Sequence, residues 1–117
     1  MAAVGLGYLG NSAIWRLLGS SGTIFLVPFW EEAVKTGLGF LVGRLIFVHA
    51  FFGLGEASLE FYRRRKIAAG LAFVTHLGFG FLTLFLWRAS GSPVLGWLAA
   101  SCLHFLWNWF VQRFGRG

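Results

Sequence analysis

Four long apolar stretches, separated by short polar or basic breaks, dominate the pattern of residues along the chain. They cover residues 22–42, 45–62, 67–87 and 93–111. Each stretch is close to the roughly 20 residues that an α-helix needs to cross a bilayer. We therefore predict four transmembrane helices. The second and third should be antiparallel neighbours, because only the short basic turn at residues 63–66 connects them.

The first 19 residues are also apolar, but Asn11 and Arg16 interrupt them. We expect a short interfacial or membrane helix here rather than a full span. Pro28 lies inside the first span, where its missing backbone donor favours a kink or a helix start just before the glutamates that follow. The predicted fold is an all-α membrane protein in a single domain of residues 1–117, a bundle of four transmembrane helices plus this N-terminal helix.

Composition agrees with a membrane protein. The chain has 57% hydrophobic and 12% charged residues, whereas soluble domains have about 25% charged residues. The net charge of +6 does not indicate a nucleic-acid partner, because the basic residues fall between the apolar spans. The turn at 63–66, Arg16, Arg113 and Arg116 share one side, opposite Arg44 and Arg88. This bias predicts an integral plasma (inner) membrane protein with a cytoplasmic C-terminus and lipid as a partner.

Three charged side chains stand inside the first span, at Glu31, Glu32 and Lys35. A charge at that depth costs about 2.5–3.5 kcal/mol on insertion scales, so we expect these residues to have a role. Lys35 lies three and four residues after the two glutamates and can form a supporting ion pair with one of them. The other carboxylate is then free to polarise a water molecule.

Each later span also holds an ionisable group well inside its ends. Counting about 1.5 Å per residue from the cytoplasmic ends places these groups and Glu32 at depths that differ by only about 7 Å. Asn108 follows His104 by one helical turn and offers an amide donor for an oxyanion. We therefore predict one polar cavity formed by the catalytic candidates Glu31, Glu32, Glu56, His76, His104 and Asn108.

Carboxylates and imidazoles together are also common zinc ligands, and a catalytic zinc site keeps one position open for water. A Zn²⁺ ion is therefore a candidate cofactor, with the ligands Glu32, Glu56, His76 and His104. We assign His49 a structural role nearer the far surface. Glu60 should form a surface ion pair with Arg63 and Arg64, and Cys102 should face lipid or pack.

The polar residues resemble a known set of motifs in their order along the chain. Glu31-Glu32-x-x-Lys35, Phe52-x-x-x-Glu56, His76 and His104-x-x-x-Asn108 resemble the motifs of PrsW-type intramembrane proteases. These are related to the CAAX prenyl endopeptidases, whose Glu-Glu-x-x-x-Arg and Phe-x-x-x-His patterns fit less well. The resemblance implies cleavage of a membrane-anchored protein substrate, as in site-one cleavage of anti-sigma factors. It also implies that the glutamates and histidines form the active site, with or without a metal ion.

Two other functions compete with proteolysis. The chain is shorter than such proteases, which usually have more membrane spans, and this favours a noncatalytic scaffold that binds partner subunits and keeps the polar cluster for helix packing. Intramembrane glutamates and histidines are also typical of proton or ion pathways.

Overall fold

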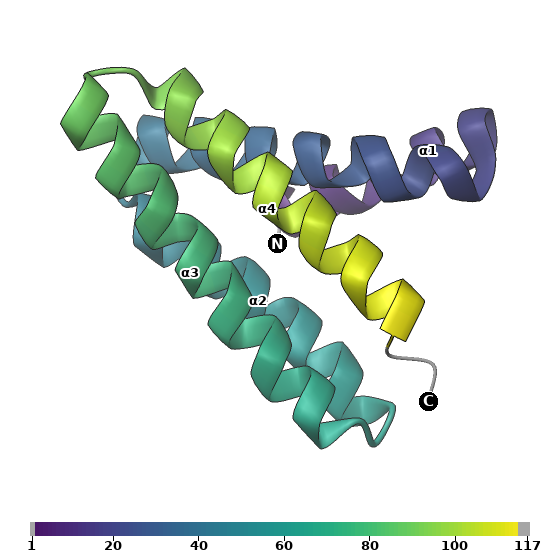
Figure 1. The fold of residues 1–117 in the computed structure, drawn as a ribbon. Coiled ribbons are helices and arrows are strands. Elements are labelled where there is room, and N and C mark those ends of the chain that lie inside the picture. Colours follow the sequence, from purple (N-terminus) through teal and green to yellow (C-terminus); the bar gives the residue numbers. More distant parts are fainter. Residues whose placement is uncertain (1, 115–117) are drawn as a thin grey trace.

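A computed structural model describes the backbone of residues 2–114 and the side chains from residue 7 to residue 114. The described chain is entirely helical, with α1 (Ala2–Val42), α2 (Leu45–Tyr62), α3 (Lys66–Ser90) and α4 (Pro93–Phe114) (Figure 1). The all-α prediction is confirmed. The second predicted span coincides with α2, and the third and fourth differ from α3 and α4 by at most three residues at either end. Arg116, one of the basic residues from which a cytoplasmic C-terminus is predicted, lies outside the described residues.

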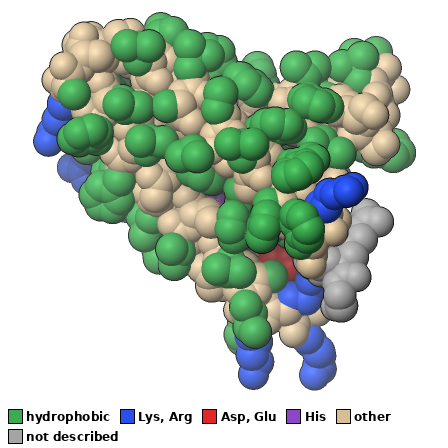
Figure 2. All heavy atoms as spheres, in the orientation of Figure 1, with side chains coloured by type: hydrophobic (Ala, Val, Ile, Leu, Met, Phe, Trp, Pro, Cys, Tyr) green, Lys and Arg blue, Asp and Glu red, His purple; other side chains and the backbone are tan. Residues whose placement is uncertain are grey.

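Within the described chain, three helices are long and apolar enough to cross a membrane: α2, α3 and α4. Their outer faces carry large exposed apolar side chains, such as Phe47, Phe81 and Phe85, and apolar atoms cover much of the visible surface (Figure 2). Monomeric soluble proteins rarely expose so much contiguous apolar surface. The chain is therefore an integral membrane protein.

The prediction of four spans and a separate short N-terminal helix is wrong. Glu31, Glu32 and Lys35 crowd one stretch of α1, so this helix is not among the candidate spans. The N-terminal segment and the first predicted span together form α1, which is broken at Gly19. The break is not at Pro28, which lies within a helical stretch.

Gly19 makes the break possible because it adopts φ 65° and ψ −157°, a conformation that side-chain-bearing residues rarely reach. The chain then folds back on itself. Asn11 hydrogen-bonds Glu31, Gly10 packs against the indole of Trp30, and Leu18 lies beside Gly22. In these pairs, residues before Gly19 face residues after it in reverse order. The two halves of α1 are therefore antiparallel and form a helical hairpin with its break at Gly19.

The remaining connections are tight. Arg64 (φ 62°) turns the chain between α2 and α3, and Gly91 (φ 72°) ends α3 in the left-handed conformation before Pro93 begins α4. The α2–α3 turn and the end of α4 lie at one end of the molecule, and the α3–α4 connection lies at the other (Figure 1). The helix α1 crosses α2 and α3 obliquely.

Glycines bring α2 and α3 close enough for their histidines to reach the interior. A Cβ atom at Gly53 of α2 would lie 2.9 Å from the Cβ of His76 on α3. In return, a Cβ atom at Gly80 of α3 would lie 2.8 Å from the Cβ of His49 on α2. Each histidine thus packs against a glycine of the other helix, and small residues are a common means of close helix approach in membranes.

Candidate functional site

Glu32 lies where all four helices meet, and its side chain is fully buried. Its Oε1 accepts hydrogen bonds from Lys35 Nζ of the same helix at 2.6 Å and from His104 Nδ1 of α4 at 2.9 Å. Its Oε2 lies 3.1 Å from His49 Nε2 of α2. A buried carboxylate is tolerable only when it is paired and hydrogen-bonded, and three partners meet that requirement here.

Lys35 links this centre to a second carboxylate. Its Nζ lies 2.9 Å from Nδ1 of His76, and His76 Nε2 lies 2.6 Å from Glu56 Oε2. An ammonium group can only donate, so Nδ1 of His76 must accept. The hydrogen of the neutral ring is then on Nε2, which donates to Glu56. Lys35 therefore fixes both the tautomer and the orientation of His76.

His49 is held between two acceptors. Its Nδ1 lies 3.0 Å from the carbonyl oxygen of Leu45, and its Nε2 faces the Glu32 carboxylate. Both contacts are hydrogen bonds only if both ring nitrogens carry hydrogen, or if Glu32 carries the proton itself. His49 thus ties α2 to the buried Glu32 carboxylate of α1.

The second glutamate of the pair, Glu31, is less enclosed. Its side chain is 20% exposed, and its Oε2 lies 3.7 Å from Nε2 of His104. The other Glu31 oxygen accepts from the amide of Asn11 on the returning N-terminal segment. His104 thus stands between the two adjacent carboxylates of α1.

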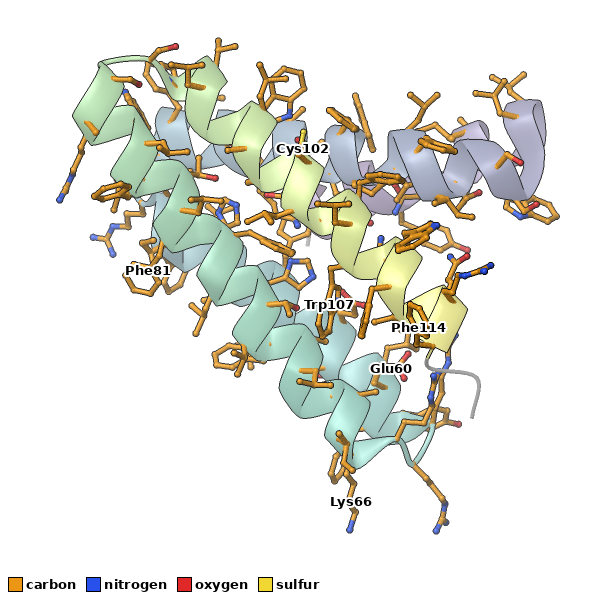
Figure 3. All side chains as sticks on the ribbon, in the orientation of Figure 1. Glu60, Lys66, Phe81, Cys102, Trp107 and Phe114 are labelled. Carbon is orange, nitrogen blue, oxygen red and sulfur yellow. The ribbon has the colours of Figure 1, made fainter. Side chains whose placement is uncertain are left out.

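A cavity of about 590 Å³ adjoins this cluster and opens between α4 and the α2–α3 pair. Glu56, His76, His104 and Asn108 line it, with Arg63 and Arg65 on the side of the α2–α3 turn. Glu60 and Trp107 project into this space, whereas Cys102 and Phe81 point outward (Figure 3). Figure 2 shows an acidic side chain in the recess between apolar surfaces, with basic side chains beside it.

The two carboxylates at the ends of the cluster, Glu56 and Glu32, differ in how far they are exposed to solvent. The Glu56 side chain is 53% exposed, although its partner His76 is almost completely buried. Since Glu56 also lines the cavity, its carboxylate can meet water or a ligand there. Glu32 cannot, because it is enclosed and its oxygens are occupied by three donors.

The structure brings most of the sequence-derived candidates together. Glu31, Glu32, Glu56, His76 and His104 belong to one cluster, and Asn108 lines the adjoining cavity. Lys35 pairs with Glu32 rather than Glu31. Glu60 pairs with Arg63 as expected, but its second partner is Arg65 and not Arg64.

Sequence reasoning missed two members of the cluster, Asn11 and His49. His49, to which we assigned a structural role nearer the far surface, is fully buried and lies against Glu32. The available signal was its spacing of seven residues from Glu56, which puts both side chains on one face of α2. The depth count obscured it, because α1 crosses the other helices obliquely (Figure 1).

The proposed zinc ligands do not fit a metal ion as they are arranged. Among the residues that the structure describes, no group of three or more His, Cys, Asp or Glu side chains could hold one. Nδ1 of His76 accepts from Lys35, and the ammonium lies against Glu32 where an ion would bind. A metal ion would have to displace Lys35 before these residues could coordinate it.

In comparisons with known proteins, the chain matches no family model, no curated protein sequence and no solved structure.

Proposed function

We propose that the chain is a metal-independent intramembrane protease of the PrsW type, in which Glu56 activates the attacking water. The observation that carries this proposal is the contact between Glu56 Oε2 and Nε2 of buried His76, with the glutamate open to a polar cavity. A general base must reach water and be held in position, and Glu56 meets both requirements. The role of activating water, predicted for Glu32 or Glu31, passes to Glu56.

In the proposed reaction, Glu56 takes a proton from a water molecule in the cavity. The resulting hydroxide attacks the carbonyl carbon of a peptide bond in a membrane-anchored substrate. The side-chain amide of Asn108, on the wall of the same cavity, donates a hydrogen bond to the oxyanion. When the carbon–nitrogen bond breaks, protonated Glu56 returns its proton to the leaving amine, and the enzyme is restored.

The other cluster residues act by positioning. Lys35 holds His76 in the tautomer that donates to Glu56, and Glu32 holds Lys35 with help from His49 and His104. The basic α2–α3 turn lies beside the cavity, so we place the cavity opening and the C-terminus at the cytoplasmic side of the inner membrane. A substrate segment would enter from that side.

The test is a survey of new protein N-termini in membranes of cells that express the chain. With the wild type, cleavage creates N-termini that are absent when Glu56→Gln is expressed, since the amide cannot accept the proton. We expect a loss of about 10²–10⁴-fold, the usual contribution of a general base. The control is Ser58→Ala on the same helix, an exposed residue that does not line the cavity, and this variant should retain cleavage.

The same N-termini in wild type and Glu56→Gln would refute the assignment of the base. No new N-termini with either protein would remove proteolysis and leave the scaffold function, in which the cluster only holds the helices together and the chain is purified with partner subunits.

A second candidate function is a proton pathway. Hydrogen bonds of 2.6–2.9 Å run without interruption from Glu56 through His76, Lys35 and Glu32 to His104. Chains of this kind are typical of proton relays in membranes. Proton flux into vesicles containing the purified protein, abolished by Glu56→Gln, would favour this function over proteolysis.

A further inference from the structure

A second cavity, of about 560 Å³, lies at the end of the molecule opposite the basic α2–α3 turn. The end of α1, the start of α2 and the last turns of α3 line it, and its side chains are apolar except for Arg44 and Arg88. Trp87 forms part of the wall and stacks on Phe40 of α1, with 5.5 Å between the ring centroids. Since α2 and α3 are antiparallel candidate spans, this end lies at the level of the lipid headgroups, where tryptophan is common.

Neither arginine of this cavity has an acidic partner within the described part of the chain. The chain has four acidic side chains, of which three belong to the buried cluster and the fourth, Glu60, pairs at the other end of the molecule. Basic side chains at the left edge of Figure 2, near this end, likewise have no acidic side chain beside them on the visible face. Two unpaired guanidinium groups on one cavity favour an anion, and arginine is well suited to phosphate.

An apolar groove of about 350 Å³ continues from this cavity along α2. It lies between α2 and the end of α1, and it shares Arg44 and Phe47 with the cavity. It reaches Phe52, eight residues beyond Arg44, which is about 12 Å along the helix toward the interior of the bilayer. Every side chain that lines the groove is apolar except Arg44. A cationic cavity thus opens into an apolar channel, as an amphiphilic ligand requires.

We propose that these two spaces form a binding site for one anionic phospholipid, with its phosphate at Arg44 and Arg88 and one acyl chain in the groove along α2. A phosphodiester has two free oxygens that can accept hydrogen bonds from both guanidinium groups. A lipid with a choline headgroup carries its own ammonium group, which would meet the two arginines with like charge. A free phosphate ester would use the arginines and leave the groove unfilled.

This inference does not depend on the proposed protease activity. It concerns only the end of the molecule away from the buried cluster, so a chain that acts as a scaffold or a proton pathway would bind lipid in the same way. It also holds whichever end is cytoplasmic, because headgroups border both sides of a bilayer. Lipid binding is therefore the measurement, and its failure is distinct from a failure to find cleavage.

The experiment titrates the full chain, purified in detergent micelles, with phosphatidylglycerol or with phosphatidylcholine of the same acyl chains, and counts bound lipid by native mass spectrometry. We expect the wild type to bind one phosphatidylglycerol at least about tenfold more tightly than phosphatidylcholine. The double variant with Arg44→Gln and Arg88→Gln should bind phosphatidylglycerol about 25-fold more weakly, or about fivefold for each arginine. Its affinity for phosphatidylcholine should not change.

The matched control is the double variant with Lys66→Gln and Arg113→Gln, which removes the same charge from exposed positions at the other end of the molecule. It should change the affinity for phosphatidylglycerol by less than about twofold, because attraction at that distance is screened. Glycerophosphoglycerol, the same headgroup without acyl chains, should not displace the bound lipid. Circular dichroism checks that each variant is helical. If the Arg44 and Arg88 double variant does not fold, Arg88→Gln alone is measured, with a loss of about fivefold.

Four results would overturn the proposal. Equal affinity of the wild type for the two lipids would show that charge does not select the ligand. A folded arginine variant that keeps the wild-type affinity would place the lipid elsewhere. An equal loss in the Lys66 and Arg113 control would reduce the effect to net charge. Displacement by glycerophosphoglycerol at the concentrations at which the lipid binds would assign the arginines to a free phosphate ester instead of a lipid.

Discussion

Glu32 and Glu56 are both paired with histidine, yet the protein treats them in opposite ways. Glu32 is fully buried with three hydrogen-bond partners drawn from three helices. Glu56 has its bond to His76, is half exposed, and borders a cavity. The comparison separates a carboxylate that holds the helices together from one that can do chemistry. Residue type alone does not distinguish the two roles, whereas access to water does.

Lys35 and His76 couple these two regions. Since Lys35 donates to both Glu32 and His76, a disturbance on the buried side reaches Glu56 by changing how His76 is held. Buried polar networks of this kind specify one arrangement when every member is satisfied. Substitutions on the buried side and on the open side should therefore differ in their effect on stability.

The largest effect on stability is expected from Glu32→Ala, which leaves the ammonium of Lys35 buried without its counter-charge. Breaking a buried ion pair on one side typically costs about 3–5 kcal/mol in the free energy of unfolding. Glu56→Ala should cost about 1 kcal/mol or less, because water in the cavity can accept from His76 in its place. Unfolding in mixed detergent micelles measures both. Similar losses for the two variants would show that Glu32 and Glu56 stabilise the fold to the same extent.

A smaller effect on stability is expected at Gly80, where the lack of a side chain makes room for the buried His49. Gly80→Ala places a Cβ atom 2.8 Å from the Cβ of His49, and overpacking of this kind typically costs about 1–3 kcal/mol. The matched control is Gly78→Ala on the same helix, where a new Cβ meets nothing within 4 Å. That variant should gain about 0.5–1 kcal/mol, since alanine favours the helix. Equal stability of the two variants would show that α2 and α3 are not in this close contact.

The smallest effect is expected at the basic turn. Glu60 pairs with Arg63 at 3.2 Å and Arg65 at 3.1 Å, but both arginines are more than half exposed. Glu60→Gln should therefore cost at most about 1 kcal/mol, and the loss should shrink at high salt. A loss as large as that of Glu32→Ala would mean that this ion-pair group is shielded from solvent.

Much of the fold could be predicted from the sequence, because apolar stretches and their breaks are local features. The limits of α2 follow from Gly43-Arg44 before it and the basic turn after it, and Gly91 and Pro93 separate α3 from α4. The N-terminal hairpin could not be predicted in this way. Its break depends on Gly19, which is one of 17 glycines, and on contacts such as Asn11 with Glu31 between distant residues.

The membership of the cluster was also largely predictable, since charged and imidazole side chains inside apolar spans are costly unless they meet. Their separate roles were not. Glu31 and Glu32 are adjacent in the chain, yet one is fully buried and the other partly exposed. Which glutamate Lys35 pairs with, and whether His49 joins them, depends on the angle at which α1 crosses the other helices.

The sequence by itself determined that the chain is all helical, where α2, α3 and α4 lie, and which ionisable side chains must find partners inside. The tertiary structure decided that Glu32 is enclosed and Glu56 open, that His49 belongs to the cluster, and that an ammonium lies where a metal was expected. The physical reason is that helix formation and the cost of buried charge are set by residues near in sequence. Hydrogen-bond partners and access to water are set by how whole helices cross.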